Sequence, residues 1–513
     1  MFTHRFRVGG RVSAIHIHIH TRTCEACVYN MKLEGGRVGG RVIDLKAMRR
    51  RLLHTGTCLL LVLTPSTSGL RILSRAFAPA KASDVLSSLA ADAAVIEAGG
   101  AGVIDAYGES SGWLKSFEAQ IAEALGKERA VFVPTGVAAQ NMALAVHAEL
   151  PFTSSRTQPT PSVLLHRSSH LEMHEERAYA TLLGLFPIFA GEVNQLLTAT
   201  DVERQLLRLG AVGSAPACIL VEVPMRELGC ATPSWAELLA LRALATKYGV
   251  PLHLDGARIW EIAPYYAESA GASLPEIIAL FDTAYVSFYK GIGAVTGAML
   301  VGSDAFIERT RPWRRRLGAN PYTVFPYALS CARGYLMHAS SFASRWRKLR
   351  DLAPQLRAAA ASEGGKLVFV PEVPRCCQCH VFLGAGDSLD VLDAARDAVD
   401  AQHGVRVYER LRRADDPLCL TRPSGDANNA APDWWFEWTL GPAHVELADD
   451  VFVDAWRAFF HVLLGGTDSS SLALGMGPAR RFVPPSTGSI PLGPSIVPPS
   501  ASSVTQDGKS RAE

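Results

Sequence analysis

The sequence lacks three features, each of which would point to a particular class of protein. Its net charge is only +2 over 513 residues, so nothing favours nucleic acid or an acidic surface as the main partner. Ten cysteines in a chain this long are too few for a disulfide framework and indicate reduced thiols in an intracellular protein. The apolar run at residues 59–63 is far too short to span a bilayer, so no membrane partner is expected.

Acidic residues are scarce at the N-terminus. Before Lys81 the only ones are Glu25, Glu34 and Asp44, whereas arginine is frequent. This composition is typical of an organelle transit peptide, although a disordered extension or an over-long gene model would look the same. We therefore predict an extension over residues 1–80. The predicted location is cytoplasmic, with mitochondrial or plastid targeting as the alternative.

The middle of the chain alternates short apolar runs with segments of helical periodicity. The clearest strand candidates are Ala130–Val133, Cys218–Val221, Leu252–Leu254, Ala284–Phe288 and Ala298–Val301. This βα alternation predicts an α/β fold, with a mostly parallel sheet and helices on both faces, over residues 85–326.

The pattern changes after residue 326. One long helix is predicted over Tyr327–Leu356, and strand candidates such as Leu367–Val370 follow it. These elements predict a smaller α+β domain over residues 327–464. Residues 465–513 are rich in Ser, Pro and Gly and are predicted to form a disordered tail.

Two of the apolar runs end in charged residues that could meet at one site. Asp255 ends one run, and Lys290 follows the next run along the chain. In an open α/β sheet, ligands bind at the carboxyl ends of the strands. An acid opposite a pyridinium nitrogen and a lysine that bonds to an aldehyde are the pair that pyridoxal phosphate (PLP) chemistry needs. No G-x-G-x-x-G follows a strand, which disfavours a Rossmann dehydrogenase.

The motifs around these two residues resemble a known family. H-L-D-G-A-R-I-W begins at His253, and S-F-Y-K-G-I-G begins at Ser287. From about Asp105 to about Phe460 the chain resembles the threonine aldolase and aromatic amino acid β-eliminating lyase family, closest to a divergent branch with Y-K-G in place of S-K-G. The resemblance implies the PLP-dependent transferase-like fold (fold type I), with a large domain and a small C-terminal domain. It also implies pyridoxal 5'-phosphate as cofactor, an amino acid as substrate, and a homodimer or homotetramer.

Lys290 and Asp255 are the candidates for holding the cofactor directly. Desolvation at a strand end lowers the pKa of a lysine and makes Lys290 a better nucleophile toward an aldehyde. Asp255 would pair with the protonated pyridine nitrogen. The alternatives are a lysine that faces solvent and an aspartate that caps the next helix.

Further cofactor contacts are predicted at Gly136, Val137 and His170. Gly136 and Val137 lie where a strand turns into a helix, whose free N–H groups suit a phosphate. The family has a threonine where this chain has Val137, so one hydroxyl is missing. By resemblance, His170 stacks on the cofactor ring and helps move protons. Its spacing from His166 and His174 could also suggest a metal, but no metal site is predicted.

Arg258 matches the family arginine that binds the substrate carboxylate. The planar guanidinium suits this task because it makes two parallel charge-assisted hydrogen bonds. The alternative is a salt bridge to an acid such as Glu261. Arg375–His380 looks like a metal or redox motif, but its side chains would alternate between two faces, and packed core thiols are expected.

Other parts of the family's substrate site are altered in this chain. The R-S-D-T stretch near the N-terminus is not recognisable, and Glu222–Met225 lacks the histidine of the family's E-N-T-H. Two further family arginines fall at about Tyr322 and about Glu437, and an acid at the second position is expected to repel a carboxylate. Arg314–Arg316 could replace phosphate contacts, or could form a solvated helix face.

The leading hypothesis is a PLP-dependent lyase that cleaves a β-hydroxy amino acid to glycine and an aldehyde. β-Elimination, or an aminotransferase or racemase reaction on the same fold, is the alternative within enzymes. A catalytically silent scaffold that retains the fold is the alternative from another class, and the altered substrate site motivates it.

Overall fold

The computed structural model describes residues 3–8, 11–16, 37–38, 41–42, 71–109, 112–149, 161–384, 388–424 and 431–465. Most of the predicted extension, and residues 466–513 of the predicted tail, lie outside the described residues. The chain divides into two units, Met1–Gly69 and Leu70–Glu513. In the first unit, β1 (Thr3–Val8) pairs antiparallel with β2 (Arg11–His16), and β3 (Arg37–Val38) with β4 (Arg41–Val42).

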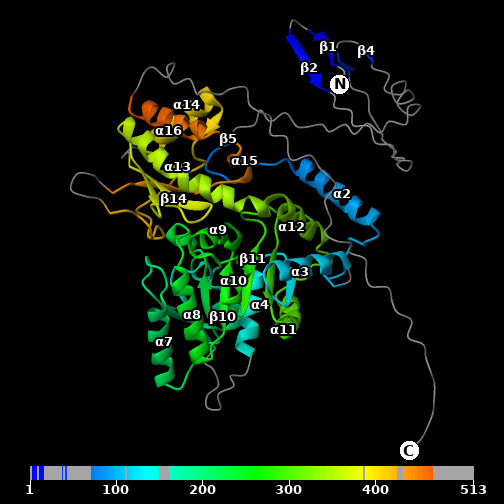
Figure 1. Cartoon of the computed structure of the whole chain (residues 1–513), viewed down its shortest axis with the longest axis vertical. Coiled ribbons are helices and arrows are strands. Elements are labelled where there is room, and N and C mark those ends of the chain that lie inside the picture. Colours follow the sequence, from blue (N-terminus) through cyan, green and yellow to red (C-terminus); the bar gives the residue numbers. More distant parts are fainter. Residues whose placement is uncertain are drawn as a thin grey trace, which may run out of the picture. The chain divides into compact units, whose positions relative to one another are not determined.

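The second unit contains a seven-stranded sheet in the order β6-β12-β11-β10-β9-β7-β8 (Figure 1). Its strands are β6 (Arg129–Val133), β7 (Ser162–His166), β8 (Phe186–Ala190), β9 (Cys218–Glu222), β10 (Leu252–Gly256), β11 (Thr283–Ser287) and β12 (Ala298–Gly302). Only β12 runs against the others in this sheet. The predicted mostly parallel α/β sheet is therefore confirmed.

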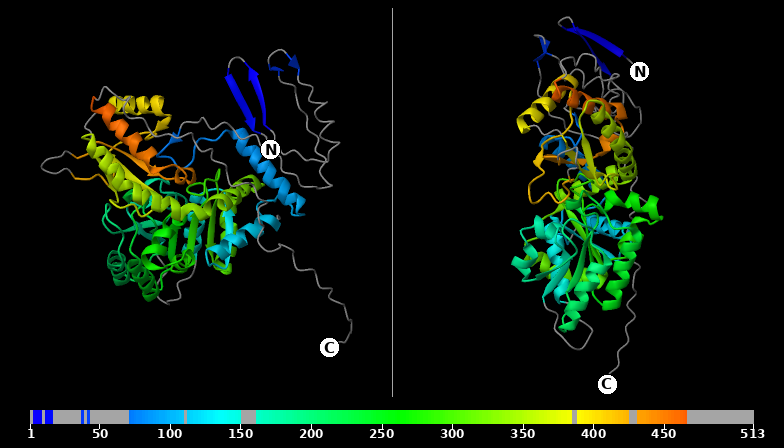
Figure 2. Two further views of the ribbon diagram at one scale, coloured as in Figure 1. Left: turned by 45° about the horizontal axis from the view of Figure 1, so that its top comes forward. Right: turned by 90° about the vertical axis from the view of Figure 1, so that its left-hand side faces the viewer.

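Helices cover both faces of this sheet (Figure 2). They are α3 (Gly112–Ala124), α4 (Gly136–Glu149), α5 (His170–Met173), α6 (Ala178–Leu183), α7 (Ala199–Ala211), α8 (Trp235–Tyr248), α9 (Ile259–Ala270), α10 (Leu274–Ala279) and α11 (Asp304–Arg316). Successive strand residues enter different clusters: Ile219 and Val221 pack in one core, Cys218 and Leu220 in another. Because both faces are buried, the strands read as continuous apolar runs rather than alternating ones.

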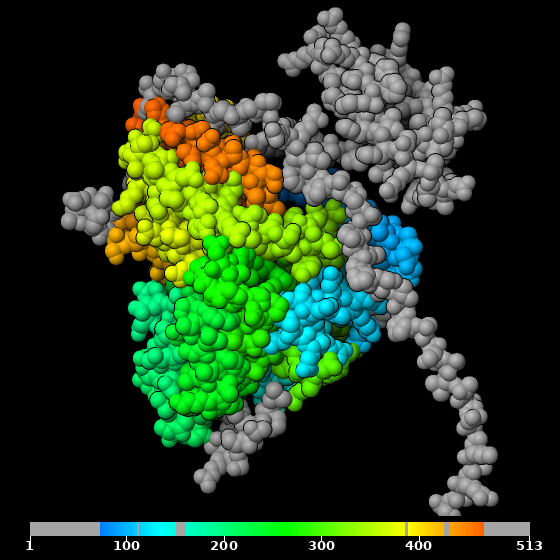
Figure 3. Space-filling model, in the orientation of Figure 1, coloured from blue at the N-terminus to red at the C-terminus, as the bar shows by residue number. Residues whose placement is uncertain are grey.

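A smaller α+β unit follows in sequence. Its antiparallel sheet contains β13 (Leu367–Val370), β14 (Gln378–Leu383), β17 (Trp434–Thr439) and β16 (Arg412–Arg413). Its helices are α13 (Phe342–Ser362), α14 (Leu389–His403), α15 (Pro442–Val445) and α16 (Asp449–Leu463). Helix α13 packs on both α9 and α16, and thus joins the two domains, whose surfaces are in direct contact (Figure 3).

The single long helix predicted over Tyr327–Leu356 is wrong. The structure has α12 (Phe325–His338) and α13, separated by one 3-10 turn, η2 (Ala339–Ser341). The Ser341 hydroxyl donates to the carbonyl oxygen of His338 at 2.7 Å, and Arg345 donates to the same carbonyl oxygen at 3.2 Å. These side chains compete for a backbone acceptor of the helix, which explains the break.

Residues 71–80 form a strap along the small domain. They belong to the extension predicted over residues 1–80, whereas in the structure β5 (Arg71–Ile72) pairs in parallel with β15 (Val405–Arg406). The Thr439 N–H donates to the carbonyl oxygen of Ser74 at 3.1 Å. The strap then leads into α2 (Ala82–Ala98), which packs on α12. Among the described helices, none has both the length and the apolar content to cross a membrane.

Gly441 fixes how closely the strap approaches the small domain. A Cβ at this position would lie 1.6 Å from the carbonyl oxygen of Ala76. We therefore expect Gly441→Ala to release the strap and to speed tryptic cleavage after Arg75, measured by mass spectrometry. Gly210→Ala is the control, because a Cβ there meets nothing within 4 Å. Equal cleavage rates in both variants and the wild type would contradict this expectation.

Candidate active site

The ends of β9, β10 and β11 bring acidic and basic side chains together. Asp255 is the register partner of Glu222 on one side and of Tyr285 on the other. Asp255 is 1% exposed, and burial raises its pKa, while the nearby charges of Lys290 and His170 lower it. Burial lowers the pKa of Lys290 to about 8, with a further contribution from Arg258 and an opposing one from Asp255. The structure therefore places Asp255 and Lys290 at one site.

Glu222 is a member of this site that sequence reasoning missed as a functional residue. Burial raises its pKa to about 7, and the charge of Asp255 adds to the effect. Its carboxylate accepts the backbone N–H groups of His170 and Arg226, each at 3.0 Å. The signal was available, since Glu222 ends its own apolar strand just as Asp255 does.

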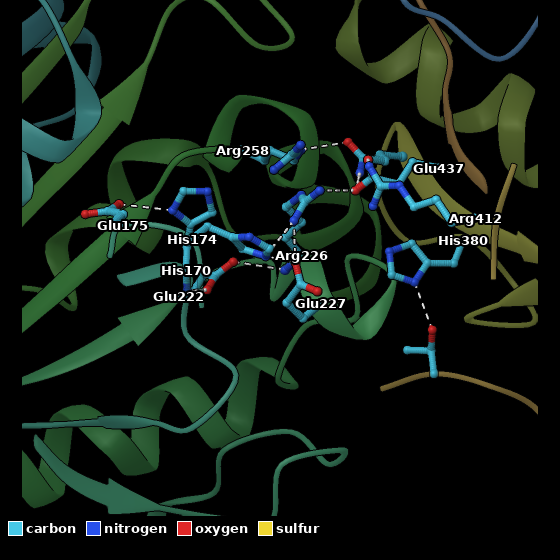
Figure 4. A network of polar contacts seen from close by, with 12 residues as sticks. His170, His174, Glu175, Glu222, Arg226, Glu227, Arg258, His380, Arg412 and Glu437 are labelled. Carbon is cyan, nitrogen blue, oxygen red and sulfur yellow. Dashed lines mark hydrogen bonds and ion pairs between the residues drawn. The ribbon is translucent and has the colours of Figure 1, made fainter. Parts of the chain in front are cut away.

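His170 begins α5, with its ring near the charges of Asp255 and Lys290. Burial lowers the pKa of His170 to about 4, so the imidazole is neutral at neutral pH. Its Nδ1 lies 3.0 Å from Oε1 of Glu175, whose pKa burial raises to about 7 (Figure 4). With a neutral ring this contact is a hydrogen bond rather than an ion pair.

Gly136 and Val137 form the N-terminus of α4. Gly136 packs on Tyr285 so closely that a Cβ would lie 2.2 Å from the tyrosine hydroxyl. Burial raises the pKa of that hydroxyl, and the charge of Asp255 and a hydrogen bond to Tyr289 add to the effect. Tyr285 thus connects the helix end to Asp255. The first N–H groups of a helix lack partners within the helix and can bind an anion.

A cavity of about 470 Å³ opens between the two domains above Lys290. Its wall combines the strap residues 74–80 with side chains from both domains, among them Arg258, Tyr289, Lys290, Gln378, Arg412 and Glu437. Phe77 of the strap packs on Gly293 and lies 5.3 Å from the His338 ring, centroid to centroid. The strap, which sequence analysis placed in an extension, therefore contributes to the cavity.

Arg258 bonds across the cavity to the small domain. Its Nε donates to Oε1 of Gln378 at 2.8 Å, and Gln378 donates to Glu437 at 3.2 Å. The alternative salt bridge to Glu261 does not appear among the described ion pairs. Within the described residues, no hydrogen bond engages the two terminal nitrogens of Arg258, so they can take a carboxylate.

Glu437 does not present an unbalanced charge to the cavity. One of its oxygens lies 2.8 Å from Nη2 of Arg226, and the other lies 3.3 Å from Nη2 of Arg412 (Figure 4). The expected repulsion of a carboxylate is therefore reduced by Arg412 and by Arg226, although Arg226 also pairs with Glu227. Arg226 is the first residue of η1 (Arg226–Leu228), and its Nη1 also bonds to Nε2 of His174.

The arginines of α11 and the cysteines near β14 have structural roles. Arg316 pairs with Glu149, at the opposite end of α4 from Gly136, and Arg314 is buried against the carbonyl oxygen of Tyr107. These arginines therefore do not replace phosphate contacts. Cys376, Cys377 and Cys379 are fully buried, as expected of core thiols. Within the described ranges, no cluster of His, Cys, Asp and Glu is arranged to hold a metal ion.

Comparison with known proteins agrees with this geometry. Residues 88–361, more than half of the chain, match the family described as Beta-eliminating lyase. Aldolase vrtJ of Penicillium aethiopicum is 34% identical over 204 residues, which cover 39% of this chain and 48% of that protein. Alanine racemase TOXG of Cochliobolus carbonum is 33% identical over 204 residues, which cover 39% of this chain and 49% of that protein. The chain spans about half the length of these two relatives.

A solved structure extends the similarity over both domains. It is that of a candidate L-allo-threonine aldolase from Listeria monocytogenes, 30% identical to this chain with a TM-score of 0.62. The match covers 77% of this chain and 95% of that one.

The raised pKa of Glu175 predicts a pH-dependent effect of Glu175→Gln. A folded pKa of about 7 against a usual 4.5 means that the wild type loses stability as pH rises from 4.5 to 7. Glutamine mimics the protonated acid and removes this loss. We expect the variant to gain stability over the wild type between pH 5 and pH 8, by up to roughly 3 kcal/mol. Urea denaturation at both pH values measures it.

The exposed neighbour Glu176 provides the control variant, Glu176→Gln. It changes the same chemical group without the burial. A stability difference between Glu175→Gln and the wild type that is the same at pH 5 and pH 8 would contradict the expectation.

Proposed function

We propose that this protein is a PLP-dependent lyase acting on an amino acid, and that it cleaves a β-hydroxy amino acid to glycine and an aldehyde. The premise is its family: the chain belongs to the Beta-eliminating lyase family and has the PLP-dependent fold type I. The observation that carries the proposal is local. Lys290 and Arg258 share one cavity, and the buried acids Asp255 and Glu222 lie at neighbouring strand ends beside Lys290.

The residues present fit pyridoxal phosphate. Lys290 would bond to the aldehyde carbon of the cofactor, and Asp255 would pair with its pyridine nitrogen. Glu222 would add a second negative charge beside that nitrogen. Two buried acids with raised pKa values need a positive partner, which a protonated pyridine provides. His170 would stack on the ring, and Gly136 and Val137 would hold the phosphate at the N-terminus of α4. When bound, the cofactor supplies an electron sink for the bond that breaks at Cα.

The chain's own residues then bind the substrate and move its proton. The free terminal nitrogens of Arg258 suit the α-carboxylate, which orients the amino acid toward Lys290. Cleavage between Cα and Cβ requires the removal of a proton from the β-hydroxyl. His170 is neutral at neutral pH and can accept this proton at its imidazole. Glu175, bonded to Nδ1, fixes the orientation of the ring.

A racemase is the second candidate, because a relative of 33% identity is named as an alanine racemase. β-Elimination, transamination and a silent scaffold also remain open. Products distinguish them: glycine with an aldehyde for the aldolase, the opposite enantiomer for the racemase, and a keto acid for the other two reactions. A protein that keeps its cofactor without turnover would be the scaffold.

The protein is further predicted to be a homodimer or homotetramer, without nucleic acid or membrane as partner. Its predicted location is the cytoplasm, with mitochondrial or plastid targeting as the alternative. Multi-angle light scattering of the purified protein checks the oligomeric state, and a monomer would contradict it.

Replacing Lys290 tests the proposed reaction. The wild type should show visible absorbance from the bound cofactor and should release an aldehyde from L-threonine, L-allo-threonine or an aromatic β-hydroxy amino acid. Lys290→Ala removes the covalent attachment, so we expect loss of that absorbance and a fall in rate of at least about a thousandfold. Lys247→Ala is the control, since Lys247 is exposed and pairs with Glu203. Full activity in Lys290→Ala would overturn the mechanism.

Tyr285 provides a test of the phosphate site. Its hydroxyl lies against Gly136, where Val137 lacks the hydroxyl of the family threonine. We propose that Tyr285 donates to the phosphate, and we expect Tyr285→Phe to weaken PLP binding about five- to tenfold. Equilibrium titration of the cofactor-free protein with PLP measures this change. Tyr266→Phe, which removes a buried hydroxyl bonded to Pro233, is the control; equal affinities for both variants would contradict the role.

A further inference from the structure

The position of the Lys290 amine depends on the turn that carries it. In the part of the chain that the structure describes, no hydrogen bond or ion pair engages this amine, and its Nζ lies 5.7 Å from the centre of the Tyr289 ring. The residues that follow form a tight turn, in which the Gly293 N–H donates to the carbonyl oxygen of Lys290 at 3.0 Å. The direction of the amine is therefore set by how rigidly this turn is held.

Gly291, the residue after Lys290, packs directly on the carboxyl group of Glu261. A Cβ at Gly291 would lie 2.7 Å from the carboxyl carbon and from Oε1 of Glu261. Glu261 is 2% exposed and belongs to the first turn of α9. Burial raises its pKa, while three nearby cations, Arg258, Arg345 and Lys290, and a hydrogen bond from the Gly291 backbone lower it. The buried carboxyl group therefore supports one side of the turn.

Arg345 holds the carbonyl group of the same glycine. Its Nη1 donates to the carbonyl oxygen of Gly291 at 2.8 Å. Its Nε donates to the Ser341 hydroxyl at 2.9 Å, and its Nη2 donates to the carbonyl oxygen of His338 at 3.2 Å. Arg345 is 0% exposed, so each of these bonds would be costly to lose. The side chain that interrupts the helix between α12 and α13 thus also reaches the turn after Lys290.

The two side chains come from helices that pack on each other. Glu261 belongs to α9 and Arg345 to α13, and these helices are in direct contact. Between them, the buried Sγ of Cys377 lies 3.7 Å from the carbonyl oxygen of Glu261 and 3.5 Å from that of Phe342. Gly291 is therefore gripped by two buried side chains whose own helices are fixed to each other.

We propose that Glu261 and Arg345 are positioning residues for Lys290, which hold Gly291 from two sides and fix the direction in which the lysine amine meets the cofactor. The inference rests on the proposed function, because it takes Lys290 to bond to the aldehyde of PLP. Both residues act through the backbone of the turn. A lysine held in this way loses little freedom when it bonds to an aldehyde, so the covalent bond is favoured.

Equilibrium titration of the cofactor-free protein with PLP and with pyridoxamine 5'-phosphate tests this role. The two probes share the ring and the phosphate, but only PLP has the aldehyde to which Lys290 can bond. We expect Glu261→Ala to weaken PLP binding about tenfold and pyridoxamine phosphate binding less than about twofold, because only the covalent bond needs a positioned lysine. Glu268→Ala is the matched control, since Glu268 lies on the same helix and pairs with Arg347 and Arg350 of α13 at the surface.

Two further variants keep the test sharp if Glu261→Ala perturbs the fold. Glu261→Gln keeps the shape of the side chain and an acceptor for the Gly291 N–H, so we expect it to bind PLP within about threefold of the wild type. Gly291→Ala adds a Cβ that meets the Glu261 carboxyl group and displaces the turn without leaving a void. We expect it to weaken the binding of PLP more than that of pyridoxamine phosphate, as Glu261→Ala does.

The outcomes separate this inference from the proposed function. If the wild type bonds covalently to PLP and Glu261→Ala binds PLP as tightly, only the positioning role is overturned. The same holds if the two probes weaken equally, because the effect would then be structural, or if Glu261→Gln loses as much PLP affinity as Glu261→Ala. If the wild type forms no covalent bond with PLP, both the proposed function and the positioning role are overturned.

Discussion

Asp255 and Glu222 are buried side by side at the ends of parallel strands, and the surrounding site balances their charge. Burying one carboxylate is costly, and a second next to it adds repulsion. Backbone N–H groups of Ala257, His170 and Arg226 donate to the two acids. These bonds fix where α5 and η1 begin, and hence where the His170 ring and the Arg226 side chain lie. The acids thereby organise the segments that follow β7 and β9, and they create the need for a positive group beside Lys290.

The small C-terminal domain contributes polar side chains to the site. Gln378 and Glu437 reach from the small sheet to Arg258 and Arg226 of the large domain. Helix α13 and the strap hold the domains in register, so these bonds connect two rigid surfaces. The cavity is therefore lined by charged side chains from both domains, and Phe77 of the strap packs on Gly293 in its wall.

Local sequence patterns predicted much of the fold, and their failures have physical causes. The strand Leu367–Val370 agrees with β13 residue for residue, because burial and β-branching mark it locally. The helix predicted over Tyr327–Leu356 is interrupted by serine and arginine side chains that bond to the His338 carbonyl oxygen, a competition that periodicity does not register. Arg314–Arg316 are near the predicted phosphate site only in sequence: Arg316 pairs with Glu149 at the other end of α4, and Arg314 bonds to the carbonyl oxygen of Tyr107.

The sequence by itself determined that Asp255 lies at the end of a buried strand, that Lys290 follows another, and that a glycine begins the helix after β6, since these are properties of single segments. Only the tertiary structure decided that Glu222 lies beside Asp255, that the strap borders the cavity, and that Arg412 reaches Glu437. Each of these depends on which distant strands become neighbours and in what register. Pairing between strands is set by the packing of the whole core, so no local pattern of residues records it.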